Sequence, residues 1–108
     1  MTYQIHPLAD IIPAMSEPEY QALLADIKAL GLRDPITLYD GKVLDGRHRY
    51  RACEEAGIEP TFEEFKGSDT AAFVLSRNVK RRHLNQGQIA MVLLQMDVLV
   101  SKLQAEAQ

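Results

Sequence analysis

One short stretch of the chain, residues 43–52, combines residue types that could bind an anion. Two apolar residues end a predicted strand, Asp45 and Gly46 form a sharp turn, and the predicted helix that follows lasts to about Ala56 and ends at Gly57. The first backbone N–H groups of a helix have no partner within it, and the helix dipole favours negative charge at that end. Four basic side chains surround this helix start: Arg47, His48, Arg49 and Arg51.

Arginine is well suited to phosphate because its planar guanidinium group can bind two phosphate oxygens at once. The turn at Gly46 and the basic residues after it therefore predict a phosphate site. A solvated basic helix face is the alternative interpretation, and this stretch by itself does not decide between the two.

The distribution of charge supports a localised site. The chain of 108 residues predicts one domain, and 46% hydrophobic and 25% charged residues are typical of a globular protein. A net charge of −3 argues against a generally basic surface for nucleic acid. Eight of the twelve Lys and Arg residues nevertheless fall within residues 42–51 and 77–82, which indicates an anion site on an otherwise acidic protein.

Cys53 is the only cysteine, so the sequence predicts no internal disulfide and fits a reducing cytoplasm. Its position among core-facing residues of the predicted helix favours a buried apolar residue over a nucleophile. The N-terminus lacks the pattern of a signal peptide, and no apolar run reaches the ~20 residues of a membrane span. We therefore expect a cytoplasmic protein without a membrane partner.

The elements before the basic stretch can be placed from capping residues and apolar spacing. Residues 3–5 predict a short strand and residues 7–15 an irregular segment. A helix starts at Ser16, where Glu19 completes a capping box, and ends at Gly31. Apolar residues at helical spacing predict its buried stripe: Tyr20, Leu23, Leu24, Ile27 and Leu30.

A hairpin leads directly into the basic stretch, because Asp40-Gly41 is a strong turn signal between strands over residues 35–39 and 42–44. A further strand is predicted over residues 58–65, with two core residues, Phe62 and Phe65. Ser68 or Asp69 caps a short helix that ends near Arg77 and turns three residues inward: Ala72, Phe73 and Leu75. The second basic window follows that predicted helix.

The last predicted helix starts at Asn85, with Gln88 three residues later. It carries more apolar residues than one stripe can hold: Ile89, Val92, Leu93, Met96, Leu99, Val100 and Leu103 in one set, and Ala90, Met91, Leu94 and Val98 in another. A small domain cannot easily cover both sets, so we expect a homodimer through this helix or packing against a further C-terminal region. Leu99 and Leu103 are predicted to lie furthest from the domain body.

Three segments in this order resemble the N-terminal domain of the ParB/sulfiredoxin superfamily, the ParB-like nuclease domain. They are residues 30–36 (LGLRDPI), 46–52 (GRHRYRA) and 78–84 (NVKRRHL), and the likeness covers roughly residues 3–90. The resemblance implies an α+β fold with a small mixed sheet, flanking helices and a long C-terminal helix. Residues 1–84 would form the nucleotide-binding domain, and residues 85–108 the helix for packing, oligomerisation or continuation into a further region.

The resemblance also implies a function, because this domain in ParB proteins binds and slowly hydrolyses CTP. We therefore expect a nucleoside triphosphate, CTP or ATP, and a regulatory role in DNA partition or in plasmid or phage maintenance, with DNA reached through a further region or a partner. The implied phosphate-side residues are Gly46, Arg47, His48, Arg49, Arg51, Asn78 and Arg81. The implied base-side loop is Leu32, Arg33, Asp34 and Pro35, and Asn78 is also the candidate metal contact.

Two positions depart from the family pattern. Arg47 stands where sulfiredoxins have their catalytic cysteine, so the resemblance does not extend to sulfinic-acid reduction. Arg77 stands where ParB proteins have a metal-binding glutamate, and Mg²⁺ prefers carboxylate oxygens, so a role for magnesium stays open.

Other functions compete with nucleotide binding. In a nuclease or another phosphotransfer enzyme, Asp45 would serve as the general base, although a turn-forming and helix-capping role also explains this residue. In a DNA-contacting module, both basic windows would meet a phosphate backbone.

Overall fold

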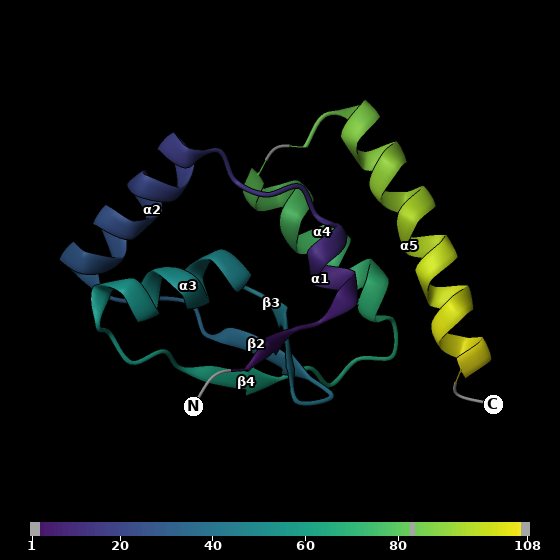
Figure 1. Ribbon diagram of the computed structural model, residues 1–108, viewed down its shortest axis with the longest axis horizontal. Helices are drawn as coiled ribbons and strands as arrows, with labels where there is room; N and C mark the ends of the chain where they lie inside the picture. The colour runs from purple at the N-terminus through teal and green to yellow at the C-terminus, as the bar shows by residue number, and fades with distance from the viewer. Residues whose placement is uncertain (1–2, 83, 107–108) are drawn as a thin grey trace.

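The computed structural model of the protein (Figure 1) describes residues 3–82 and 84–106, and for residues 80–82 the backbone alone. The described residues form an α+β fold of five helices and a four-stranded mixed sheet. In chain order the elements are β1 (Gln4–Ile5), α1 (Pro7–Ile11), α2 (Glu17–Leu30), β2 (Ile36–Tyr39), β3 (Lys42–Asp45), α3 (Arg47–Ala56), β4 (Phe62–Glu64), α4 (Thr70–Arg82) and α5 (Gln86–Glu106).

The sheet has the strand order β1-β3-β2-β4. β3 pairs parallel with β1 and antiparallel with β2, and β2 pairs parallel with β4. Asp40 and Gly41 both have positive φ, 54° and 72°, which is the conformation of a tight two-residue hairpin turn. Gly46 alone separates β3 from α3, so the predicted strand and helix are confirmed. The predicted place of Asp45 in the turn and as a helix cap is wrong, because Asp45 is the last residue of β3 and Gly46 is the N-cap residue of α3.

Helices cover both faces of the sheet. Val43 and Leu44 are neighbours in β3 and therefore point to opposite faces. Val43 packs with Ile36, Leu38 and Tyr50 of α3, and α2 packs in turn on α3. Leu44 packs with side chains of α1 and the residue after it, and of α4 and α5, which lie on the right of Figure 1: Leu8, Ile12, Val74, Val92 and Met96.

The segment predicted to be irregular, residues 7–15, begins with the helix α1. His6 is its N-cap residue, and Pro7 occupies the first helical position, where a missing N–H costs nothing. α4 was predicted to end near Arg77 but continues to Arg82, so the second basic window is helical. The strand predicted over residues 58–65 is confined to Phe62–Glu64.

Several predicted core positions are wrong. Leu30 is 64% exposed at the end of α2, and Ala72 is also exposed, whereas Val74, two residues further along α4, is fully buried. Phe62 is partly exposed at the edge strand, where its ring packs against Tyr3 with centroids 5.1 Å apart. Cys53 is buried against α2, as predicted.

The apolar residues of α5 divide between core and surface. Val92 and Met96 are buried, whereas Met91, Leu94 and Val98 are 58–64% exposed. Leu99, which was expected far from the domain body, packs against the core instead, and Leu103 is partly buried. None of the helices in the described ranges combines the length and apolar character that crossing a membrane requires.

A pH dependence of stability follows from the cap of α1. The Nδ1 atom of buried His6 accepts a hydrogen bond from the Leu8 N–H at 3.1 Å. Burial, and then the charge of Lys42, lower the pKa of His6 below its ordinary value of 6.5, although Asp40 acts in the opposite direction. The unfolded chain therefore binds a proton more readily, and the free energy of unfolding should fall as the pH drops below 6.5 towards the lower folded-state pKa.

Urea denaturation between about pH 7 and pH 5 measures this effect. His6→Asn is the matched variant, because asparagine is a good N-cap residue and does not titrate in that range. We expect the loss of stability on acidification to be smaller in His6→Asn than in the wild type. Equal losses in the two proteins would contradict the role assigned to His6.

Candidate functional site

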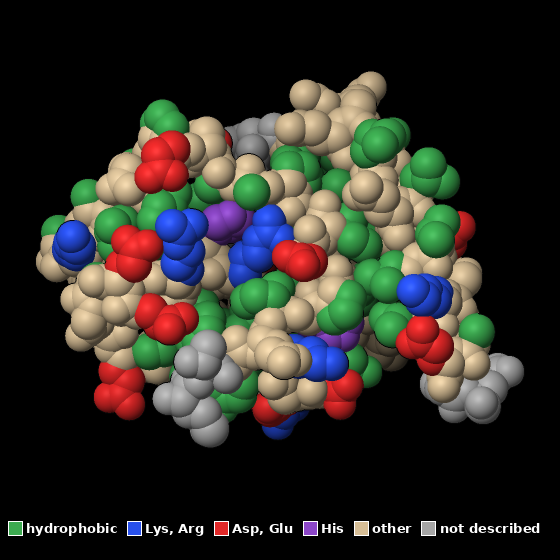
Figure 2. All heavy atoms as spheres, in the orientation of Figure 1, with side chains coloured by type: hydrophobic (Ala, Val, Ile, Leu, Met, Phe, Trp, Pro, Cys, Tyr) green, Lys and Arg blue, Asp and Glu red, His purple; other side chains and the backbone are tan. Residues whose placement is uncertain are grey.

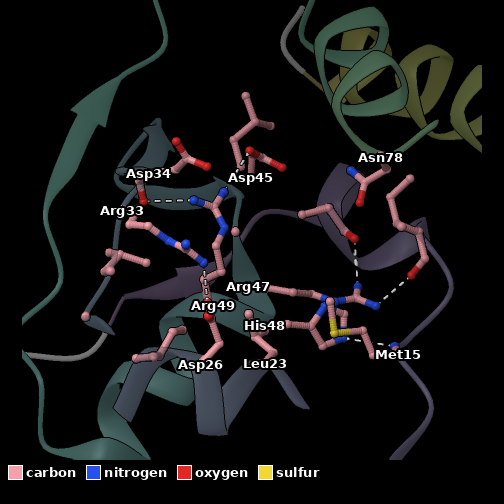
Figure 3. A pocket seen from close by; sticks show the side chains of 17 residues that line it. Met15, Leu23, Asp26, Arg33, Asp34, Asp45, Arg47, His48, Arg49 and Asn78 are labelled. Carbon is pink, nitrogen blue, oxygen red and sulfur yellow. Dashed lines mark hydrogen bonds and ion pairs between the residues drawn. The ribbon is translucent and has the colours of Figure 1, made fainter. Parts of the chain in front are cut away.

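A cavity of about 270 Å³ lies at the N-terminus of α3 (Figure 3). Its wall is built from α1, α2, the loop after α2, the end of β3, the start of α3, and α4. Three segments that the sequence singled out meet here, through Leu32, Arg33 and Asp34 of the first, Gly46, Arg47, His48 and Arg49 of the second, and Asn78 of the third. Asp45 also lines the cavity.

Gly46 permits the tight turn for two separate reasons. Its φ of 102° lies in the left-handed region, which side chains with a Cβ rarely adopt. A Cβ atom at this position would also lie 2.9 Å from Nη2 of Arg49 and 3.4 Å from Cγ1 of Ile36. The guanidinium group of Arg49 therefore folds back over the turn in space that only glycine leaves open.

Asp45 ties α3 and α4 together. Its Oδ2 atom accepts hydrogen bonds from Nη2 of Arg49 at 3.1 Å and from Nε of Arg77 at 3.3 Å, and the residue is only 5% exposed. Arg49 also donates to the carbonyl oxygens of Asp34 and Pro35, at 2.9 and 3.2 Å. This geometry gives Asp45 a structural role, whereas its service as a general base stays a prediction.

Arg47 and His48 connect the start of α3 to the chain between α1 and α2. Arg47 donates from Nη1 to the Ala9 carbonyl at 2.7 Å and from Nη2 to the Ile12 carbonyl at 2.6 Å. The Nε2 atom of His48 accepts a hydrogen bond from the Met15 N–H at 3.1 Å. An imidazole nitrogen accepts only when it carries no proton, so this bond belongs to neutral histidine.

The charges of the cavity lining are balanced. Three arginines and three aspartates line it: Arg33, Arg47 and Arg49, and Asp26, Asp34 and Asp45. Arg33 forms an ion pair with Asp26 on α2. Figure 2 likewise shows basic and acidic side chains interspersed on the face in view. The binding of an anion in this cavity would therefore be favoured by individual hydrogen-bond donors and by the helix N-terminus, and not by a net positive charge of the lining.

Some predicted site residues do not line the cavity. Arg51 lies 4.2 Å from the centre of the Tyr20 ring and forms an ion pair with Glu55 at 3.2 Å, so it serves the α2–α3 contact. Pro35 takes part through its carbonyl oxygen, which Arg49 binds. Arg81 lies within α4, but its side chain is outside the described part of the structure.

Sequence reasoning missed the contribution of α1 and α2 to the wall. Ala9, Ile12 and Met15 line the cavity, and so does Asp26. Nothing in the sequence distinguishes Asp26 from the other polar residues of its helix. The start of α1 could have been predicted from Pro7, which follows the N-cap residue His6, because proline is favoured at the first position of a helix.

The described residues contain no group of three or more His, Cys, Asp or Glu side chains placed to hold a metal ion. Comparisons of the chain with protein-family models, with curated proteins and with solved structures found no match. The assignment of a function therefore depends on the cavity itself and on the sequence motifs.

The double requirement for glycine at position 46 can be tested against a second glycine. Gly57 also has positive φ, but a Cβ atom there would meet nothing within 4 Å. We expect Gly57→Ala to lower the free energy of unfolding by about 1–2 kcal/mol through backbone strain. Gly46→Ala should cost roughly 2–4 kcal/mol, because the added Cβ also displaces Arg49 from Asp45. Urea denaturation measures both, and equal losses would contradict the proposed packing.

Proposed function

We propose that the cavity at the N-terminus of α3 binds the phosphate groups of a nucleoside triphosphate, CTP or ATP. The observation that carries this proposal is the convergence of residues 32–34, 45–49 and 78 on one cavity. Residues 32–34, 46–49 and 78 each belong to one of the three motifs that resemble the ParB-like domain, and Asp45 directly precedes the second motif. A helix N-terminus with arginine and histidine around it is a suitable environment for phosphate oxygens.

The shape and lining of the cavity fit part of a nucleotide. Its volume of about 270 Å³ lies just below the roughly 300–1,000 Å³ of typical ligand pockets, so phosphate groups would fill it and the nucleoside would extend to its mouth. Leu23, Ile27 and Leu32 supply an apolar wall beside the polar donors. The loop with Arg33 and Asp34 adds polar groups for the nucleoside side.

The biological role that we propose is a nucleotide-dependent switch in DNA partition or in plasmid or phage maintenance. This part of the proposal is supported by the resemblance of the three motifs to ParB proteins. Contact with DNA would come from a further region or a partner, because the lining of the cavity is balanced in charge and does not resemble a basic surface for a duplex.

A nuclease or another phosphotransfer enzyme is the second candidate. It would need Asp45 to meet a substrate proton at hydrogen-bond distance. The Oδ2 atom of this buried carboxylate is bound by Arg49 and Arg77, which favours nucleotide binding over chemistry at Asp45. Arg77 also replaces the family's metal-binding glutamate, so we expect nucleotide affinity to depend little on magnesium.

Two arginines with similar exposure provide a matched test of the site. The Arg33 side chain is 65% exposed and its residue lines the cavity, whereas the Arg51 side chain is 62% exposed and lies elsewhere. Arg33→Glu and Arg51→Glu change the net charge equally. We expect Arg33→Glu to weaken nucleotide binding about tenfold or more, because a charge-assisted contact is replaced by repulsion. Arg51→Glu should have little effect.

Calorimetric titration with CTP, ATP, GTP and UTP, with and without magnesium, measures these affinities. If the wild type binds none of the four, the proposed function is wrong. Equal weakening by the two substitutions would assign binding to general electrostatic attraction rather than to the cavity.

The homodimer that the sequence predicts remains a prediction, and the structure identifies better residues for its test. Leu94 and Val98 are 62% and 64% exposed on α5, and burying such apolar surface would favour association. We expect Leu94→Glu with Val98→Glu to lower self-association, whereas exposed Gln86→Glu with Gln104→Glu adds the same charge without removing apolar surface. Sedimentation velocity measures the difference, and a wild type that is monomeric at all concentrations contradicts the dimer.

A further inference from the structure

Residues 9–15, from the end of α1 to the connection with α2, form a strap across the start of α3. Hydrogen bonds hold it there, among them those from Arg47 to the Ala9 and Ile12 carbonyl oxygens and to the Asp10 carboxylate, and the one from the Met15 N–H to His48. Figure 3 shows the bond between His48 and Met15 and the bonds from Arg47 to the carbonyl oxygens of Ala9 and Ile12. Ala9, Ile12 and Met15 also line the cavity, so the strap is part of its wall.

The strap uses the same groups that a phosphate would use. The guanidinium group of Arg47, whose side chain is only 16% exposed, faces two neutral carbonyl oxygens and, at 3.3 Å, the carboxylate of Asp10. A phosphate group carries a full negative charge and can bind both arms of the guanidinium group, so it adds a charge–charge attraction that a neutral carbonyl oxygen lacks. A phosphate at the N-terminus of α3 therefore competes with the strap for Arg47.

We propose that the strap covers the site in the free protein and that a bound phosphate group takes its place on Arg47. This inference rests on the proposed function and adds to it a conformational step. The exchange replaces carbonyl acceptors with a charged one, and it releases residues 12–15 from α3. Ligand binding is then opposed by the cost of opening the strap, so weakening the strap should tighten binding.

Asp10 offers a way to weaken the strap from outside the cavity. Its side chain is 75% exposed, it does not line the cavity, and it holds Arg47 by an ion pair. Asp10→Asn should therefore increase the affinity for inorganic triphosphate and for ATP about two- to fivefold, which corresponds to the loss of one exposed ion pair. Asp97→Asn, at an exposed position of α5, changes the net charge equally and serves as the control.

Amide hydrogen exchange followed by NMR reports on the strap directly. The Met15 N–H is bound to His48, whereas the Gly31 N–H, in a residue that also lines the cavity, is bound to the Ile27 carbonyl at 2.8 Å. With saturating ATP, we expect exchange to become faster at Met15 and not at Gly31.

The two measurements separate this proposal from the proposed function. Faster exchange at Met15, together with tighter binding by Asp10→Asn than by Asp97→Asn, is the expected result. The strap proposal is wrong if ligand binds but exchange at Met15 is unchanged or slower, or if the two variants bind with equal affinity. Either result would leave the proposed nucleotide binding intact. If neither inorganic triphosphate nor ATP binds, both proposals fall.

Discussion

The buried carboxylate of Asp45 is the contact on which the arrangement of the cavity depends. A charge removed from water is costly unless it is paired, and here one oxygen atom accepts from arginines on two different helices. Arg77 thereby fixes α4 relative to the end of β3, and Arg49 fixes the first turn of α3. Because Arg49 also binds the Asp34 and Pro35 carbonyl oxygens, the same network determines where the loop after α2 lies.

The parts of the fold that the sequence predicted correctly are those specified by neighbouring residues. The capping box of Ser16 and Glu19, the Asp40-Gly41 turn and the stop at Gly57 each involve residues that are close along the chain. α1 escaped prediction because five residues are too few for a recognisable period. Its stability comes from distant contacts, including burial of Leu8 and the bonds of Arg47 to its last carbonyl oxygens.

The same distinction applies to the candidate site. The motifs predicted which segments meet, and residues 32–34, 46–49 and 78 do line one cavity. The partners of the arginines could not be predicted, because carbonyl oxygens belong to every residue and leave no mark in a sequence. Arg51 is an instructive exception, since Glu55 lies four residues further along the same helix, and such pairs are readable from spacing alone.

The partners of the arginines also imply an order in which they can respond to a ligand. Arg49 is held by the buried carboxylate of Asp45. If the guanidinium group moved away, the negative charge of this carboxylate would stay buried with fewer positive partners. Arg47 is held by neutral carbonyl oxygens and by the solvent-exposed carboxylate of Asp10, which water can solvate after the contact is broken. An anion can therefore recruit Arg47 at lower cost than Arg49. The two residues look equivalent in the sequence, but Arg49 is tied to the buried carboxylate that organises the cavity, whereas Arg47 is the cation that we propose exchanges its partners.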